Sequence, residues 1–314
     1  MEGLTSRQKL KGLLRGEAPL RPLLIPGIFA LGSRLENLPL PDFLGNPTKI
    51  ANALRQIRAA LKVDGVMCYG DPSLEAEALG VKGEWGAGES RKLMTPLSGG
   101  FREVAPQVLR MGRIPVALAV LERLKTMLRD ETALMMRVTG PYTLARQLDD
   151  GSSDIRSVSA QIVADLVKGY LEAGADVIFL EEDTLPTEPV EQAGWKSSLD
   201  PIINVIRFYE SLPVLRVAAD RENGGFLAAQ SWDCGVCITA RLAEETDFGT
   251  ATPWLGVDLP LSDLTNAPDP QAMLTGLPGK GASFLSSLDP PRDTDVKRLT
   301  RVLTTVRNQL QEGG

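Results

Sequence analysis

Acidic side chains stand at or just after the ends of several apolar segments of strand length. The carboxylates that share this placement are Asp71, Glu181, Asp183, Asp220 and Asp258. Gathered at one mouth, they could transfer protons, hold a cationic or polar substrate, or bind a hard cation such as Mg²⁺ through oxygen. Each could instead cap a helix or pair with Arg216, the main cation nearby. A cluster this acidic should raise the pKa of at least one carboxylate, which suits acid–base chemistry.

Histidine is absent from all 314 residues. Its absence excludes Ser-His-Asp and Cys-His catalysis and histidine-bound zinc. Any acid–base step must therefore use carboxylates, Tyr, Lys, Cys or bound water. The three cysteines, Cys68, Cys234 and Cys237, are too few for a disulfide scaffold.

The overall charge and the apolar patterning restrict the partners. The net charge is −6 and the basic residues are scattered, which argues against a nucleic-acid partner. We find no run of about 18 apolar residues and no N-terminal apolar leader, so we expect no membrane partner and a cytoplasmic location. A small molecule is the expected substrate.

Apolar segments of strand length alternate with helix-like segments along the chain. The eight predicted strands are residues 22–28, 64–70, 133–139, 176–182, 213–219, 235–240, 254–258 and 282–287. They are continuously apolar, as strands buried on both faces should be. Apolar residues at helical spacing predict helices at 47–61, 114–129, 154–173, 200–211 and 295–310. This repetition predicts an α/β fold, a parallel (β/α)8 TIM barrel that forms one domain over residues 1–314.

One connection is much longer than the others. Residues 72–132 form an insertion after the second strand, and its part 82–105 is rich in Gly, Ser and Pro. We expect this part to form a small hairpin or a lid over the barrel mouth.

In this architecture the active site lies at the C-terminal ends of the strands. Four further residues fall there and are predicted to contact substrate: Phe29, Tyr69, Tyr142 and Leu288. The two tyrosines could equally be ordinary packing at the rim. Cys234 and Cys237 begin the sixth strand, at the opposite end of the barrel, and we interpret them as core packing.

Four stretches resemble one family in order and spacing. They are TSRQKLKGLLRGEAPLRPLLIP at 5–26, DGVMCYGDPSLEAEALG at 64–80, VTGPYTLARQL at 138–148 and YLEAGADVIFLEED at 170–183. Together they resemble the uroporphyrinogen decarboxylase superfamily, which includes the corrinoid-dependent methyltransferases. The EAEALG ending is closer to the methyltransferase branch.

The resemblance also implies which family residues are present. Asp71 stands where the decarboxylases hold the pyrrole N–H groups of their substrate, but their arginine pair after strand one is missing from PGIFALGSR at 26–34. The zinc ligands of the thiol methyltransferases, His-x-Cys and a later Cys, correspond here to Arg216, Ala218 and Leu288. We therefore expect no metal site of the His/Cys zinc type. An acidic mouth should also repel a tetrapyrrole with eight carboxylates.

The leading hypothesis from the resemblance is methyl transfer between a corrinoid (cobalamin), free or on a corrinoid protein, and a small substrate. Asp71, Glu181 and Asp183 would orient the substrate and manage protons, while Arg216 would hold an anionic group or balance them. One alternative is a decarboxylase of an atypical, smaller substrate. Another is a barrel that has lost catalysis and only binds a ligand. By analogy with relatives, the protein could form a homodimer.

Overall fold

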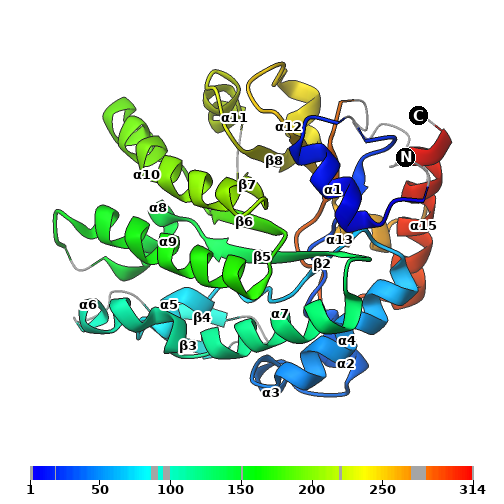
Figure 1. Ribbon diagram of the computed structural model, residues 1–314, viewed down its shortest axis with the longest axis horizontal. Helices are drawn as coiled ribbons and strands as arrows, with labels where there is room; N and C mark the ends of the chain where they lie inside the picture. The colour runs from blue at the N-terminus through cyan, green and yellow to red at the C-terminus, as the bar shows by residue number, and fades with distance from the viewer. Residues whose placement is uncertain are drawn as a thin grey trace.

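The structure, a computed structural model, describes residues 3–17, 19–85, 91–94, 100–149, 151–218, 221–269 and 281–312. Its main sheet has eight parallel strands in the order β1-β10-β9-β8-β7-β6-β5-β2. They are β1 (Leu23–Leu24), β2 (Gly65–Met67), β5 (Ala133–Thr139), β6 (Val177–Glu182), β7 (Leu212–Val217), β8 (Gly235–Thr239), β9 (Leu255–Asp258) and β10 (Phe284–Ser286). Helices surround this nearly closed ring (Figure 1). The predicted (β/α)8 barrel and all eight strand positions are confirmed.

A single aspartate bridges the gap between β1 and β2. The backbone N–H of Asp64 donates to the carbonyl of Leu24 at 2.8 Å, and the N–H of Leu24 donates to the Asp64 carboxylate at 2.8 Å. Arg21 pairs with the same carboxylate at 2.7 Å. Strand β1 is shorter than predicted, although Ile25 and Gly27 beyond it still donate to the carbonyls of Leu285 and Ser287 at 2.8 and 3.2 Å.

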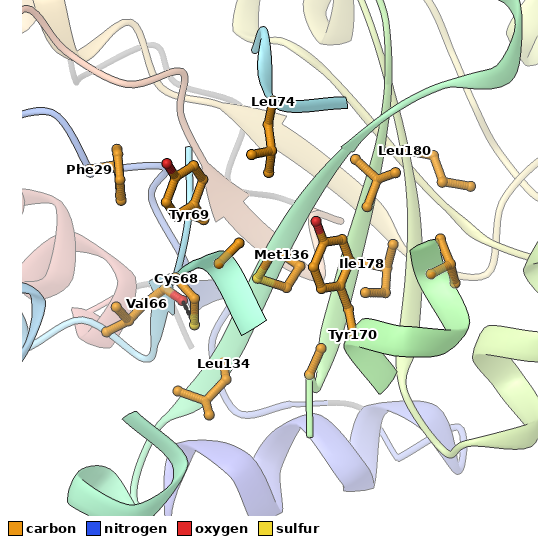
Figure 2. Close-up of a cluster of buried hydrophobic side chains, with 14 of the residues drawn as sticks. Phe29, Val66, Cys68, Tyr69, Leu74, Leu134, Met136, Tyr170, Ile178 and Leu180 are labelled. Carbon is orange, nitrogen blue, oxygen red and sulfur yellow. Dashed lines mark hydrogen bonds between the residues drawn. The ribbon is translucent and has the colours of Figure 1, made fainter. Parts of the chain in front are cut away.

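Most strands are followed by a helix that packs on the outside of the barrel. The helices after the strands are α4 (Pro47–Leu61), α7 (Ile114–Leu128), α8 (Pro141–Leu148), α9 (Ile155–Ala173), α10 (Pro189–Phe208), α11 (Arg221–Ala228), α12 (Ala240–Glu245), α13 (Leu261–Asn266) and α15 (Val296–Glu312). Short helices α2 (Leu31–Leu35), α3 (Leu40–Leu44) and α5 (Leu74–Ala78) precede the insertion or begin it. Figure 2 shows how Leu134, Met136, Ile178 and Leu180 of the strands meet Tyr170 of α9 in the layer between sheet and helices.

Helix α10 corrects one prediction. We predicted a helix at 200–211 that begins with Asp200 as its N-cap. The helix instead begins at Pro189 and runs through Pro201 to Phe208. Pro201 is exposed, so water can satisfy the carbonyl that loses its helical N–H partner.

The insertion contains the expected hairpin. Strand β3 (Lys82–Trp85) pairs antiparallel with β4 (Arg91–Met94). The segments 86–90 and 95–99 lie outside the described residues, so the lid stays a prediction. Helix α6 (Phe101–Val104) and the 3-10 helix η2 (Ala105–Arg110) lead from the hairpin to α7.

Among the described residues, Phe101–Leu128 is long and apolar enough, by length and composition alone, to cross a membrane. We had expected no such stretch from the sequence. In the structure it is divided into α6, η2 and α7, and α7 packs against α4 and α9. Its buried side chains include Ile114, Leu121 and Leu124. The apolar residues therefore form the inner face of a barrel helix.

Helix α1 (Ser6–Leu14) closes the N-terminal end of the barrel. Thr5 and Gln8 form a capping box that fixes the helix start. Leu10 and Leu13 are buried in one cluster with inward-facing strand residues, among them Phe284. The Trp254 indole N–H donates to the Leu13 carbonyl at 3.1 Å, which holds the helix in place.

Candidate active site

The alternation of side chains along the strands carries charges into the barrel interior. In three neighbouring strands the first two inward positions are apolar and the third is charged: Ala133, Met135 and Arg137 in β5, Val177, Phe179 and Glu181 in β6, and Leu212, Val214 and Arg216 in β7. The third positions lie toward the C-terminal ends of the strands. A layer of charged side chains therefore forms the floor of the barrel mouth.

Arg216 is the centre of this layer. Its two terminal nitrogens donate to Glu181 at 2.7 Å, to Asp258 at 2.9 Å and to the Ser286 hydroxyl at 2.5 Å. Its guanidinium lies 4.3 Å from the centre of the Phe179 ring. Burial alone would lower the pKa of Arg216, but Asp258 and Glu181 outweigh burial and raise it. Arg216 is therefore permanently charged.

Glu181 bridges two guanidinium groups. Its second oxygen pairs with Nε of Arg137 at 2.5 Å, while Arg137 Nη1 contacts the Gly70 carbonyl at 3.4 Å. Burial would raise the pKa of Glu181, but Arg137 and Arg216 together hold it below its usual value. The carboxylate stays ionised at neutral pH. It can position the two arginines but cannot exchange a proton there.

A cavity of about 430 Å³ opens above this floor. The charged residues on its wall are Asp71, Arg137, Glu181, Arg216 and Asp289. The other side chains on the wall are mainly apolar: Phe29, Ala30, Leu40, Leu44, Met67, Pro72, Trp85 and Leu288. A cavity of this size, apolar with a few convergent charges, is typical of a site for a small molecule.

Asp71 lies on the wall but both its oxygens are engaged. One oxygen accepts from the backbone N–H of Ser73 at 3.0 Å and from its hydroxyl at 2.9 Å, and the other pairs with Arg113 at 2.5 Å. Arg113 also binds Glu77 at 2.9 Å and donates to the Tyr69 hydroxyl at 3.0 Å. Arg113 therefore anchors the start of α7 to the loop after β2.

Asp289 lies on the wall just beyond β10. Its two oxygens accept the backbone N–H groups of Phe29 at 2.9 Å and Ala30 at 2.7 Å. Burial raises the pKa of Asp289 to about 7, against the opposing effects of these N–H groups and of Arg137. Asp289 can therefore gain or lose a proton near neutral pH, and burial, not the crowding of carboxylates that we expected, is the cause.

The structure brings five of the predicted site residues to the cavity: Asp71, Glu181, Arg216, Phe29 and Leu288. Asp258 lies beside them, paired with Arg216, and burial raises its pKa although Arg216 opposes this. Tyr69 is buried next to Phe29, with ring centroids 5.2 Å apart (Figure 2). Its hydroxyl donates to the Leu44 carbonyl at 2.7 Å.

Two further predicted residues, Asp183 and Tyr142, lie away from the cavity wall. Asp183 is exposed, because β6 ends at Glu182 and the chain has left the sheet at Asp183. Glu182 instead accepts the N–H groups of Tyr142 and Thr143 at the start of α8. The Tyr142 ring lies 5.8 Å beneath the Arg156 guanidinium, away from the cavity. Asp220 lies outside the described residues.

The sequence reasoning missed Arg137, Asp289 and Arg113. The inward period of two in β5, continued from Ala133 and Met135, was a signal that could have found Arg137. Asp289 follows Leu288 directly, but its role depends on the loop after β1. Arg113 lies far from Asp71 in sequence, and no local pattern joins them.

The placement of one cysteine is also corrected. Cys234 lies at the N-terminal end of β8, as predicted, but Cys237 is paired in register with Arg216, directly at the floor. Burial raises the pKa of the Cys237 thiol, which hydrogen bonds to Asp258. The thiol therefore stays protonated and packs in the barrel interior.

The donor set does not suit a zinc ion. In the part of the chain that the structure describes, no three His, Cys, Asp or Glu side chains come close enough together to hold a metal ion. Arg216 and Leu288 lie at the cavity, where thiolate or imidazole ligands would be needed.

Comparison with known proteins identifies a family and several solved structures of similar fold. The sequence profile of the uroporphyrinogen decarboxylase (URO-D) family matches residues 5–207. A methyltransferase from Methanosarcina mazei is similar in structure, with a TM-score of 0.78 and 18% identity over 98% of this chain and 99% of that one. A B12-independent methionine synthase from Shewanella sp. has a TM-score of 0.48 and 12% identity over 84% of this chain and 89% of that one. No curated protein matches the chain.

Proposed function

The chain belongs to the uroporphyrinogen decarboxylase family, and from this premise we propose that it transfers a methyl group between a corrinoid and a small substrate. The corrinoid would be free or carried by a corrinoid protein. The substrate would lie in the cavity above Arg137 and Arg216. The similarity in fold to a methyltransferase over nearly the whole chain supports this choice among the activities of the family.

One observation carries the proposal: a closed, charged floor lies beneath an open, apolar rim. The cavity of about 430 Å³ holds a small molecule but cannot enclose a macrocycle. Trp85 and Leu288 lie at this cavity with exposed fractions of 36% and 65%. These side chains suit the flat, largely apolar face of a corrin lying over the mouth.

A bound corrinoid supplies a cobalt centre that can accept or release a methyl group. The residues of this chain hold and shield the other reactant. Arg137 binds an anionic group, Arg216 balances Glu181 and Asp258, and Glu181 keeps the two guanidinium groups in place. Asp289 holds or releases a proton at the wall. A macrocycle over the mouth would exclude water and strengthen these charged contacts.

The same geometry disfavours the two best-known chemistries of the family. Zinc-activated thiol chemistry needs ligands that Arg216, Ala218 and Leu288 do not provide. Decarboxylation of a uroporphyrinogen needs Asp71 free to accept pyrrole N–H groups, but Arg113 and Ser73 occupy its oxygens. It also needs more cationic side chains than the two on the wall.

The test is a titration of the purified protein with methylcobalamin and, separately, with a porphyrinogen. Absorbance reports binding, and thermal unfolding reports stabilisation, because a ligand that binds only the native state raises its melting temperature. We expect methylcobalamin to raise the melting temperature and the porphyrinogen to leave it unchanged. Absence of corrinoid binding would contradict the proposal, and a response to the porphyrinogen alone would favour the decarboxylase.

A further inference from the structure

Two opposite charges on the cavity wall stand apart from the paired network of the floor. Arg216 is paired with Glu181 and Asp258, and Asp71 with Arg113. On Arg137, Nε contacts Glu181 and Nη1 contacts the Gly70 carbonyl, while no described residue binds Nη2. The Arg137 side chain is 18% exposed, so this outer edge of the guanidinium can meet a ligand.

Asp289 is the opposite member of the pair. Its oxygens accept only the N–H groups of Phe29 and Ala30, and within the described ranges no Lys or Arg lies within 4.0 Å of it. Arg137 and Asp289 feel each other's charge, and both lie on the wall of the same cavity, yet no ion pair joins them. A cavity that is otherwise mainly apolar therefore presents one cation and one anion separately.

Charges in an apolar cavity are costly unless a partner compensates them. A purely anionic ligand would satisfy Arg137 but would face Asp289 and Glu181. A purely cationic ligand would satisfy Asp289 but would face Arg137 and Arg216. A ligand that carries both signs, a short distance apart, satisfies both groups at once.

We propose that the cavity binds a small zwitterion, an N-methylated amino acid, with its carboxylate on Arg137 and its ammonium beside Asp289. The Phe29 ring, which lies on the same wall, adds an aromatic surface for methylammonium groups. This inference rests on the proposed function, because it names the methyl donor of that reaction.

The positions of the two charges place the methylated nitrogen of the ligand toward the mouth, where the corrinoid would lie. Arg137 lies two residues before the end of β5, whereas Asp289 follows the end of β10, so the ammonium end lies nearer the mouth. Transfer breaks the bond between nitrogen and the methyl carbon. The electron pair of that bond would stay on nitrogen, which becomes a neutral amine, and a reduced corrinoid over the mouth would supply the electron pair for the new bond to the methyl carbon.

The experiment is isothermal titration calorimetry of the whole protein without corrinoid, using one zwitterionic, one anionic and one cationic probe. Trimethylglycine carries both charges, 3,3-dimethylbutanoate is its isosteric anion, and tetramethylammonium is the cation alone. Charge-assisted contacts of this kind change affinity by at least about tenfold. We expect trimethylglycine to bind at least tenfold more tightly than either other probe. Equal or weaker binding of trimethylglycine would overturn the proposal.

Two variants and a control assign the ends of the ligand. Arg137→Gln should weaken trimethylglycine at least tenfold, and Asp289→Asn should make trimethylglycine and 3,3-dimethylbutanoate bind equally. Arg55→Gln, on the exposed face of α4, should leave the affinity for all three probes unchanged.

Unchanged affinity in a folded Arg137→Gln would overturn the proposal. Should Asp289→Asn unfold, the wild-type probe series still decides. Corrinoid binding with no preference for the zwitterion would remove this inference alone, leaving the proposed function intact.

Discussion

The two ends of the barrel interior are built from the same strands but filled in opposite ways. At the N-terminal end, Leu10 and Leu13 of α1 pack with Phe284 and other apolar side chains. At the C-terminal end, Arg137, Glu181 and Arg216 occupy the next inward positions and leave a cavity of about 430 Å³ above them. Apolar side chains fill the N-terminal end, whereas charged side chains form the floor of an open cavity at the C-terminal end.

The difference separates stability from function. Burial of each large apolar side chain stabilises the fold by about 1.5–3 kcal/mol. A buried ion network contributes little net stability, because desolvation offsets the attraction, but breaking it leaves uncompensated charges. The N-terminal end should therefore respond to mutation through stability alone, and the C-terminal end through both stability and ligand binding.

The largest effect should come from Arg216→Met. This change leaves Asp258 without its cation and Glu181 with only Arg137, so we expect a loss of about 3–5 kcal/mol of unfolding free energy together with all activity. Urea unfolding measures the loss. Adding Glu181→Gln and Asp258→Asn should restore much of the stability but not the activity. A loss in the single variant below about 1 kcal/mol would show that the network is not coupled in this way.

Leu10→Ala tests the opposite end. Removing this buried side chain from the apolar cluster at the N-terminal end should lower the unfolding free energy by about 2–5 kcal/mol. The affinity for trimethylglycine should stay the same, since the cavity lies at the other end of the strands. Calorimetry and urea unfolding of one preparation measure both quantities, and a parallel loss of affinity would mean that the two ends are not independent.

The pH dependence should differ in sign between Glu181 and Asp289. Glu181 has a folded pKa below its ordinary value of 4.5, so its stabilising contribution is present above that pH and is lost as the pH falls further. Asp289 has a folded pKa of about 7 against an ordinary 3.8. Its contribution is complete below about pH 3.8 and is lost as the pH rises through about 7.

Asp289→Asn should therefore flatten the fall in stability between about pH 4 and 7. Glu75, which burial also shifts to a pKa of about 7, should keep part of the slope in the variant. Unfolding free energies measured at half-unit steps of pH give the comparison. An identical slope in wild type and variant would show that Asp289 does not titrate in this window.

The smallest effect on stability should come from Leu288→Ser at the exposed rim. A surface change of this kind alters the unfolding free energy by about 0.5 kcal/mol or less. We expect about tenfold weaker binding of methylcobalamin, since Leu288 would lie under the macrocycle. Leu20→Ser, a comparably exposed leucine far along the chain from the rim, is the matched control. Equal corrinoid affinity in both variants would argue against docking at this rim.

Much of the fold could be predicted from the sequence, because buried parallel strands and amphipathic helices leave local patterns. Helix α4 shows this, since Asn46, Pro47 and the apolar spacing mark its start and inner face. Helix α10 was placed wrongly because Asp200 and Pro201 imitate a start signal. From the sequence alone, an Asp-Pro pair that starts a helix looks the same as an Asp-Pro pair on the exposed face in the middle of one.

The site was less predictable, because pairing depends on contacts between distant segments. The barrel mouth was expected to carry a net negative charge. Instead, Arg137 pairs with Glu181 and Arg113 pairs with Asp71, and both arginines come from other elements. Asp183 follows Glu181 closely in sequence but is exposed, since β6 ends at Glu182 and Asp183 lies in the loop beyond the strand. The raised pKa of Asp289 comes from burial against the loop of Phe29 and Ala30, about 260 residues away in sequence, whose N–H groups oppose the shift.

Hydrogen–deuterium exchange with and without methylcobalamin tests most directly whether the charged end of the barrel is the methyl-transfer site. We expect protection at the C-terminal mouth, in peptides that contain Phe29 and Ala30 or Leu288 and Asp289, and none in α1. Protection confined to α1 and the N-terminal end, or no protection at saturating methylcobalamin, would contradict this account.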